Sequence, residues 1–144
     1  MRRLAYSVTT TIERPIDVVF AFLSDLRSEL AWNPNARSVE KLTDGPVGVG
    51  TRFRARWAGT RPVGVEVVRS EAPTTWTMRS RAMGMEVQAT GRLEGTGEST
   101  WYTAEIELNP RGGASLVAPL VLRTMRRREA RNLRLIKAAL ETRG

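Results

Sequence analysis

The chain contains no cysteine and no histidine among its 144 residues. Without cysteine it can form no disulfide, and it offers no thiolate as a nucleophile or metal ligand. Without histidine it lacks the commonest ligand of zinc sites and the usual general base near neutral pH. We therefore expect no metal and no cofactor. Any proton transfer would depend on tyrosine and carboxyl side chains.

Long apolar runs are also missing. No run approaches the 18 residues that a transmembrane helix needs, so we expect no transmembrane segment. The first residues, MRRLAYSVTTTIERP, lack the apolar core of a signal peptide. Hydrophobic residues make up 41% of the chain, and its length suits one folded domain over residues 1–144. We expect a soluble cytoplasmic protein, either a monomer or a homodimer.

Lysine is almost absent from a basic chain. Only Lys41 and Lys137 are lysines among 23 basic residues, and the formal net charge is +8. The preference for arginine fits the codon usage of a GC-rich genome, which weakens a functional interpretation of each arginine. A charge of +8 nevertheless favours anionic surfaces such as nucleic acid or acidic lipid.

Alternating apolar residues predict a sheet of about seven strands. Residues 4–12 alternate, and so do residues 52–57, where Phe53 and Trp57 share one face and arginines occupy the other. Further strand-like segments, RSVEKL among them, are separated by turn residues such as Ala72-Pro73. Their close spacing predicts antiparallel hairpins.

Helical periodicity occurs in two places. ERPIDVVFAFLSDL after the first strand predicts one short helix, and RSELAW predicts another turn that ends before Pro34. Residues 116–142 predict a long helix that covers one face of the sheet. Its apolar side contains Ala118, Val121, Leu122, Met125, Leu133, Ile136, Ala139 and Leu140.

These segments in this order resemble the START-like (SRPBCC) superfamily, and most of all its bacterial polyketide cyclase/dehydrase branch. The similarity rests on IERPIDVVFAFLSDL, WNPN, GPVGVGTRF and NLRLIKAALE, which together with the strands cover nearly the whole chain. The resemblance implies an α+β helix-grip fold, in which a curved antiparallel sheet wraps around the C-terminal helix. It further implies a cavity between the two for a lipid or polyketide-like ligand, with the turn at residues 47–51 near its mouth.

The candidate ligand-binding residues are mostly large and apolar. Strand phase directs several aromatic and methionine side chains inward, where they would either pack the core or line a pocket. On a helical wheel Glu129 and Asn132 fall among the apolar positions of the last helix. A buried carboxylate must be paired, hydrogen-bonded or protonated, so Glu129 either pairs with an arginine such as Arg126 or anchors a ligand. The full candidate set is Phe53, Trp57, Trp76, Met78, Met85, Tyr102, Met125, Glu129 and Asn132.

The opposite side of the last helix carries arginines at positions 123, 127, 131 and 134. Charge runs on helices are usually solvated, and no aromatic residues interleave with these arginines as in a platform for single-stranded nucleic acid. Contact with nucleic acid or an acidic membrane surface is therefore not favoured by the sequence. The segment GPVGVGT lacks the lysine and the following helix of a phosphate-binding loop.

Three functions are consistent with this sequence. The first is the binding of a hydrophobic or amphipathic small molecule without turnover. A second is a cyclase or dehydratase that uses Glu129, Tyr6 or Tyr102 for proton transfer in the same cavity. The third is a basic module that binds nucleic acid, acidic lipid or an acidic protein. The lack of a nucleophile–base pair favours the first.

Overall fold

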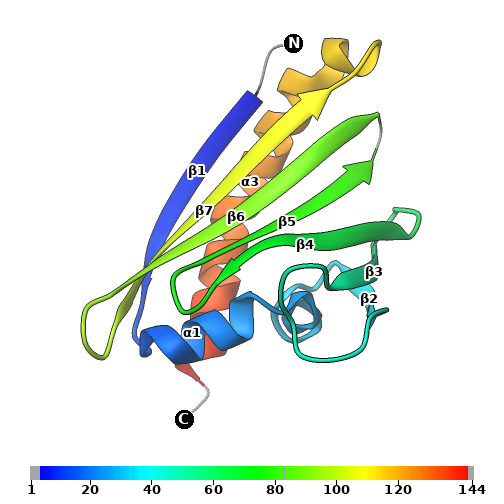
Figure 1. Cartoon of the computed structure of the whole chain (residues 1–144). Coiled ribbons are helices and arrows are strands. Elements are labelled where there is room, and N and C mark those ends of the chain that lie inside the picture. The colour runs from blue at the N-terminus through cyan, green and yellow to red at the C-terminus, as the bar shows by residue number, and fades with distance from the viewer. Residues whose placement is uncertain (1–3, 83, 143–144) are drawn as a thin grey trace.

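The computed structural model describes residues 4–82 and 84–142. One strand comes first, then two short helical segments, six strands and a long helix, as the sequence predicts (Figure 1). The elements are β1 (Leu4–Ile12), α1 (Ile16–Leu23), the 3-10 turn η1 (Leu26–Ser28), α2 (Glu29–Trp32), β2 (Ala36–Lys41), β3 (Arg52–Trp57), β4 (Val63–Glu71), β5 (Thr75–Ala82), β6 (Met85–Gly95), β7 (Thr100–Pro110) and α3 (Ala114–Glu141).

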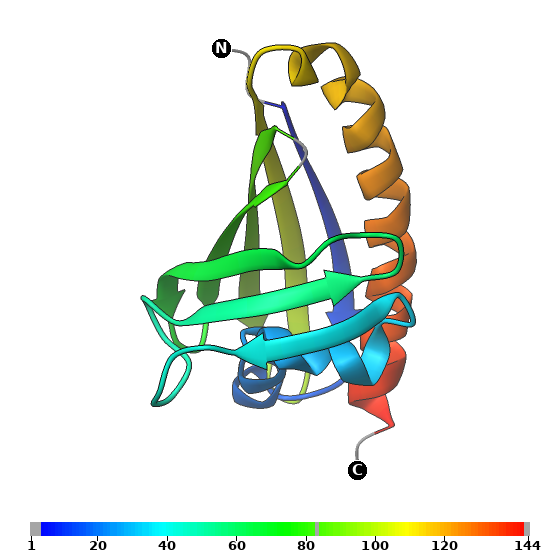
Figure 2. The ribbon, with the colours of Figure 1, turned by 90° about the vertical axis from the view of Figure 1, so that its right-hand side faces the viewer.

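The seven strands form one antiparallel sheet in the order β1-β7-β6-β5-β4-β3-β2. The first and last strands of the chain are therefore neighbours, while β2 ends the opposite edge. Figure 2 shows α3 along one side of the molecule and the curved sheet on the other. α3 contacts β1, β7 and α2, which places it over the inner face of the sheet. This arrangement confirms the expected helix-grip fold.

Strand register decides which residues face α3. Trp76 of β5 pairs with Gly91 of β6, and Gly91 pairs with Ala104 of β7. The two small residues leave room above the sheet, and the indole of Trp76 fills the space over Gly91: a Cβ added there would lie 2.1 Å from the ring. Trp76 also lies edge-on to Phe20 and stacks on Tyr102, with ring centroids 5.7 and 6.0 Å apart.

The buried apolar residues form two clusters on the inner face. The larger cluster holds α1, the centre of the sheet and the C-terminal half of α3, including Leu133 and Ile136. The smaller cluster lies between the ends of β1, β6 and β7 and the N-terminal half of α3, including Ala118. Position 129 lies on α3 between these two halves, so the residue there faces the junction of the clusters.

Candidate functional site

Glu129 faces the interior at the junction of the two apolar clusters. The pKa of its carboxyl is raised from 4.5 to about 7, chiefly by burial and also by the negative charge of Glu29, while a hydrogen bond with Asn132 acts in the opposite direction. Within the described residues Glu129 makes no ion pair. The alternative in which an arginine such as Arg126 neutralises Glu129 is therefore wrong: Arg126 is exposed, whereas Glu129 is mostly covered.

Glu29 brings a second carboxylate to the same interior. It begins α2, a helix of one turn, and its Oε1 accepts hydrogen bonds from Trp57 Nε1 (2.7 Å) and Asn33 Nδ2 (2.9 Å). Burial raises its pKa, although both hydrogen bonds favour the ionised form. The hydrogen bond from Trp57 joins α2 to β3, and the one from Asn33 lies within the same short segment of chain. Both hold the Glu29 carboxylate in place.

Two phenols complete the group. Burial raises the pKa of Tyr6 on β1, and the charge of Glu129 adds to this effect. Burial also raises the pKa of Tyr102 on β7, and Glu129, Glu29 and Tyr6 contribute in that order. Tyr6, Glu29, Tyr102 and Glu129, which we call the interior cluster, therefore come from four elements and act on one another electrostatically.

Within the part of the chain that the structure describes, two buried side-chain polar atoms have no hydrogen-bond partner: Tyr6 Oη and Trp32 Nε1. A buried donor or acceptor without a partner costs about 1–3 kcal/mol, so proteins rarely retain one. Tyr6 Oη belongs to the interior cluster, and a hydrogen-bonding group placed beside it would remove that cost. The cluster thus combines two carboxylates without a basic partner and an unsatisfied hydroxyl.

Most of the apolar candidate residues predicted from sequence lie in or beside the larger core cluster. Phe53, Trp76, Met78 and Tyr102 are buried in the larger core cluster, with Trp57 packed at its margin. Glu129 and Asn132 occupy adjoining inward positions on α3. The lining of a ligand site by these residues stays a prediction, since Trp76 and Met78 are close-packed here, at 6% and 7% exposed.

Met85 and Met125 lie in the smaller cluster, apart from the aromatic candidate residues, which belong to the larger one.

Two open depressions occur at the surface, and each includes one candidate residue. The larger, of about 480 Å³, lies over β3, β4 and β5 and includes Phe53. The smaller, of about 340 Å³, lies where β5 and β6 meet and includes Met85. Neither is lined by Trp57, Trp76 or Met78.

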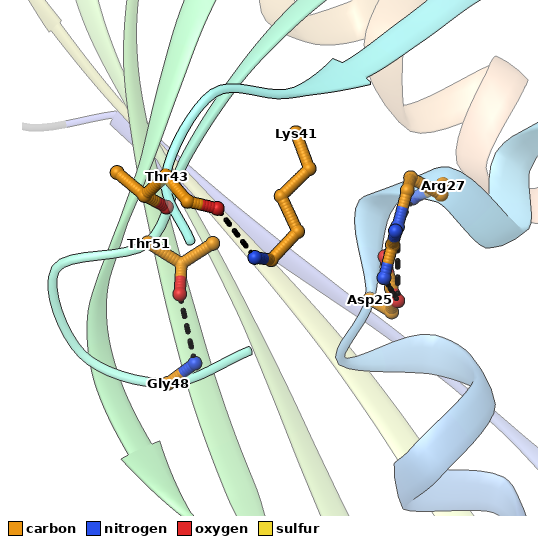
Figure 3. A network of polar contacts seen from close by, with 6 residues as sticks. All are labelled: Asp25, Arg27, Lys41, Thr43, Gly48 and Thr51. Carbon is orange, nitrogen blue, oxygen red and sulfur yellow. Dashed lines mark hydrogen bonds and ion pairs between the residues drawn. The ribbon is translucent and has the colours of Figure 1, made fainter. Parts of the chain in front are cut away.

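The glycine-rich turn between β2 and β3 uses its own backbone donors. Gly48 N donates to Thr51 Oγ1 (2.9 Å) and Thr51 N donates to Gly48 O (3.0 Å), while Gly50, at φ 93°, donates to Val67 O. Figure 3 shows this turn beside Lys41, whose Nζ donates to Thr43 O (2.5 Å). The N–H groups of Gly48, Gly50 and Thr51 therefore hold the turn together, and its position near the mouth of a cavity stays a prediction.

The short segment after α1 is fixed by an ion pair. Asp25 caps η1 by accepting from Arg27 N (3.0 Å) and binds the Arg27 guanidinium at 2.7 Å (Figure 3). Burial opposes ionisation of Asp25, but the Arg27 hydrogen bonds and the charges of Arg27 and Lys41 hold its pKa below its usual range.

Among the described residues no group of three or more acidic side chains could hold a metal ion. In the same part of the chain, no helix has the length and apolar character needed to cross a membrane.

Sequence reasoning missed Glu29. Its contact with Trp57 spans 28 residues, and its coupling to Glu129 spans 100, so no local spacing reveals either. The available signal was Asn33, four residues later, because residues four apart on a helix are neighbours. That spacing is compatible with a hydrogen bond between Glu29 and Asn33, but it does not show whether the Glu29 side chain points toward the core.

The fold and the site together define a class. A seven-stranded antiparallel sheet curved around one long C-terminal helix is a helix-grip protein, with its interior between the two layers. A family model described as "Polyketide cyclase / dehydrase and lipid transport" matches residues 3–141, and the chain belongs to this family. Among curated proteins, no match was found.

Solved structures share the fold over nearly the whole chain. Ara h 8.0201 aligns with a TM-score of 0.73 at 17% identity, covering 96% of this chain and 98% of that one. Norcoclaurine synthase from Thalictrum flavum, in complex with dopamine and hydroxybenzaldehyde, aligns with a TM-score of 0.71 at 16% identity, covering 99% and 90%. The Zhui aromatase/cyclase from Streptomyces sp. R1128 aligns with 0.70 at 15% identity, covering 97% and 92%. At these identities the likeness establishes the fold.

Proposed function

We propose that this protein binds an apolar or amphipathic small molecule between the sheet and α3, with the interior cluster as its polar anchor. The observation that carries the proposal is Glu129, an inward carboxyl that has no basic partner among the described residues and interacts electrostatically with two phenols and a second carboxyl. Burying such a group costs free energy, and a ligand that donates hydrogen bonds to it would recover part of that cost.

The surroundings define the chemistry of the ligand. Aromatic and aliphatic residues of the larger core cluster suit a flat or flexible apolar body. The two carboxyls and Tyr6 Oη suit a hydroxyl or ammonium group at one end of it. The norcoclaurine synthase complex illustrates that a protein of this fold can hold small aromatic molecules, dopamine and hydroxybenzaldehyde.

Trp76 and Met78 would have to move for a large ligand to enter, because they are packed in this structure. Methionine has three rotatable bonds and adapts to irregular shapes. Trp76 packs edge-on against Phe20 of α1, so its movement would also affect this contact. The proposal therefore predicts a change in tryptophan fluorescence when ligand binds.

The test is a thermal-shift and tryptophan-fluorescence screen against fatty acids, sterols, aromatic phenols and aromatic amines, preceded by native mass spectrometry for a co-purified molecule. A ligand at 100 times its Kd should add about 2.7 kcal/mol of stability. Glu129→Gln should weaken binding of hydroxylated or amine ligands, whereas Glu94→Gln, at an exposed position of β6, should not. If no compound raises the melting temperature, the proposal is wrong.

A proton-transfer enzyme is the second candidate, and one observation favours it. A carboxyl whose pKa is about 7 can both donate and accept a proton at neutral pH. The cyclase or dehydratase alternative would then use Glu129 as the acid–base group. Conversion of a polyketide-like substrate that Glu129→Gln abolishes, with binding retained, would establish turnover and replace the binding-only proposal.

A further inference from the structure

The outward face of α3 begins with exposed leucines. Leu116 is 87% exposed and Leu120 is 67% exposed, one helical turn apart, and Val117 beside them is 48% exposed. Isolated apolar residues are common on protein surfaces, but adjacent large ones at the end of a helix form a patch. These residues contribute to neither core cluster.

The same face continues as arginine. Positions 116, 120, 123, 127, 131 and 134 follow at intervals of three and four, so they lie along one side of the helix. Arg126 and Arg128 flank this side and are exposed as well. Between Ala114 and Leu140 the only acidic residue is Glu129, which faces inward.

Several arginines of the sheet have ion-pair partners, whereas the arginines on this part of α3 have none within the described residues. Within the described residues Arg54 pairs with Glu40 (3.6 Å) and Arg92 with Glu105 (3.0 Å). No such contact is found there for any of the six arginines of α3 between positions 123 and 134. The positive charge of α3 is therefore uncompensated and available to an external anion.

The position of α3 makes the whole face accessible. In Figure 2 the helix forms one side of the molecule, and in both Figures 1 and 2 its first turns lie at the end away from α1. Its packing partners, β1, β7 and α2, lie on the inner side. A flat anionic surface could thus approach the leucines and the arginines together.

We propose that this face, consisting of Leu116, Leu120, Arg123, Arg127, Arg131 and Arg134, docks the protein on an anionic lipid surface. The leucines would enter the boundary between headgroups and acyl chains, and the arginines would contact lipid phosphates. A solvated face accounts for the arginines but leaves the leucines unexplained. Nucleic acid would engage the arginines alone, since its backbone offers no apolar layer. This proposal does not depend on the interior site.

The test measures co-sedimentation with phosphatidylcholine vesicles, with and without phosphatidylglycerol. We expect binding only to the anionic vesicles and a loss of binding at high salt. Leu116→Gln with Leu120→Gln should weaken binding about tenfold or more, and Arg127→Glu with Arg131→Glu by a similar factor. A double variant at exposed sheet and loop positions, Arg56→Glu with Arg61→Glu, makes the same charge change off the helix and should retain most of the binding.

Three results would overturn the proposal. Equal weakening by the Arg56/Arg61 control would show that net charge, not this face, governs binding. Preference for DNA over anionic vesicles, with no effect of the leucine variants, would assign the arginines to nucleic acid. A dimer in light scattering that the leucine variants dissociate, without any vesicle binding, would assign the patch to a second copy of the chain. Circular dichroism of each variant establishes that the fold is retained.

Discussion

Replacing Glu129 by glutamine should change how stability depends on pH. In the folded protein the carboxyl titrates at about 7, whereas its ordinary value is 4.5. The folded state therefore binds the proton more tightly than the unfolded state does. Stability from this group is fully present below about pH 4.5 and is lost as the pH rises to about 7.

The size of the effect follows from the two pKa values. Each pKa unit corresponds to about 1.4 kcal/mol, so the interval from 4.5 to about 7 corresponds to about 3 kcal/mol. The side chain keeps some contact with water, which lowers the cost of its charge. We expect the wild type to lose about 1 to 3 kcal/mol of unfolding free energy across this range on account of Glu129.

Glutamine has the same shape and no titrating proton. The Glu129→Gln variant should match the wild type within about 0.5 kcal/mol near pH 4.5 and exceed it by about 1 to 3 kcal/mol near pH 8. Urea unfolding followed by tryptophan fluorescence at several pH values measures both, with Glu94→Gln as the matched exposed control. Parallel curves for wild type and variant would show that Glu129 ionises as it does in water, and the reasoning about the interior cluster would fail.

Two further substitutions test how the interior is held. Gly91→Ala should lower the free energy of unfolding by about 1–3 kcal/mol, because the new Cβ meets the Trp76 ring. Gly64→Ala, where nothing lies within 4 Å of the new Cβ, should lower it little. Similar urea midpoints for both variants would show that Trp76 can move aside. Trp57→Phe removes the N–H that donates to Glu29, so the pKa of Glu29 should rise further. The free energy of unfolding should fall by about 1–3 kcal/mol near pH 8, where Glu29 is ionised, and by less near pH 5. An equal loss at both pH values would assign the effect to packing alone.

The sequence predicted the elements because their periodicities are local. Alternation along residues 52–57 directed Phe53 and Ala55 inward, and both are fully buried. The helical spacing of Leu133, Ile136 and Leu140 identified the buried side of α3, and these residues are at most 5% exposed. Periodicity indicates which side of an element is covered, and the curved antiparallel sheet around the last helix was expected from the resemblance to a known fold.

What covers each residue depends on contacts between distant segments. The sequence analysis named Met85 among the candidate ligand-binding residues, but it could not show that Met85 packs with Ala118 in a cluster separate from Trp76. Burial of Glu29 depends on Trp57, and the pKa of Glu129 depends on Glu29, so the interior cluster exists only after β3, α2 and α3 have met. The burial and the pKa shifts of the interior cluster arise from contacts between elements, so the residue spacing within a single element cannot predict them.

The two faces of α3 carry opposite charge, which raises the question of whether they act on each other. An α-helix is about 10–12 Å across with its side chains, and the Debye length at physiological ionic strength is about 8 Å. The charge that shifts Glu129 is that of Glu29, and no arginine contributes. Reversing Arg127 and Arg131 should therefore leave the titration midpoint of Glu129 unchanged at physiological salt and raise it only at low salt, where screening is weak. A midpoint that moves at physiological salt would mean that docking on an anionic surface also changes the protonation of the interior, so that a lipid surface could release or capture a bound molecule.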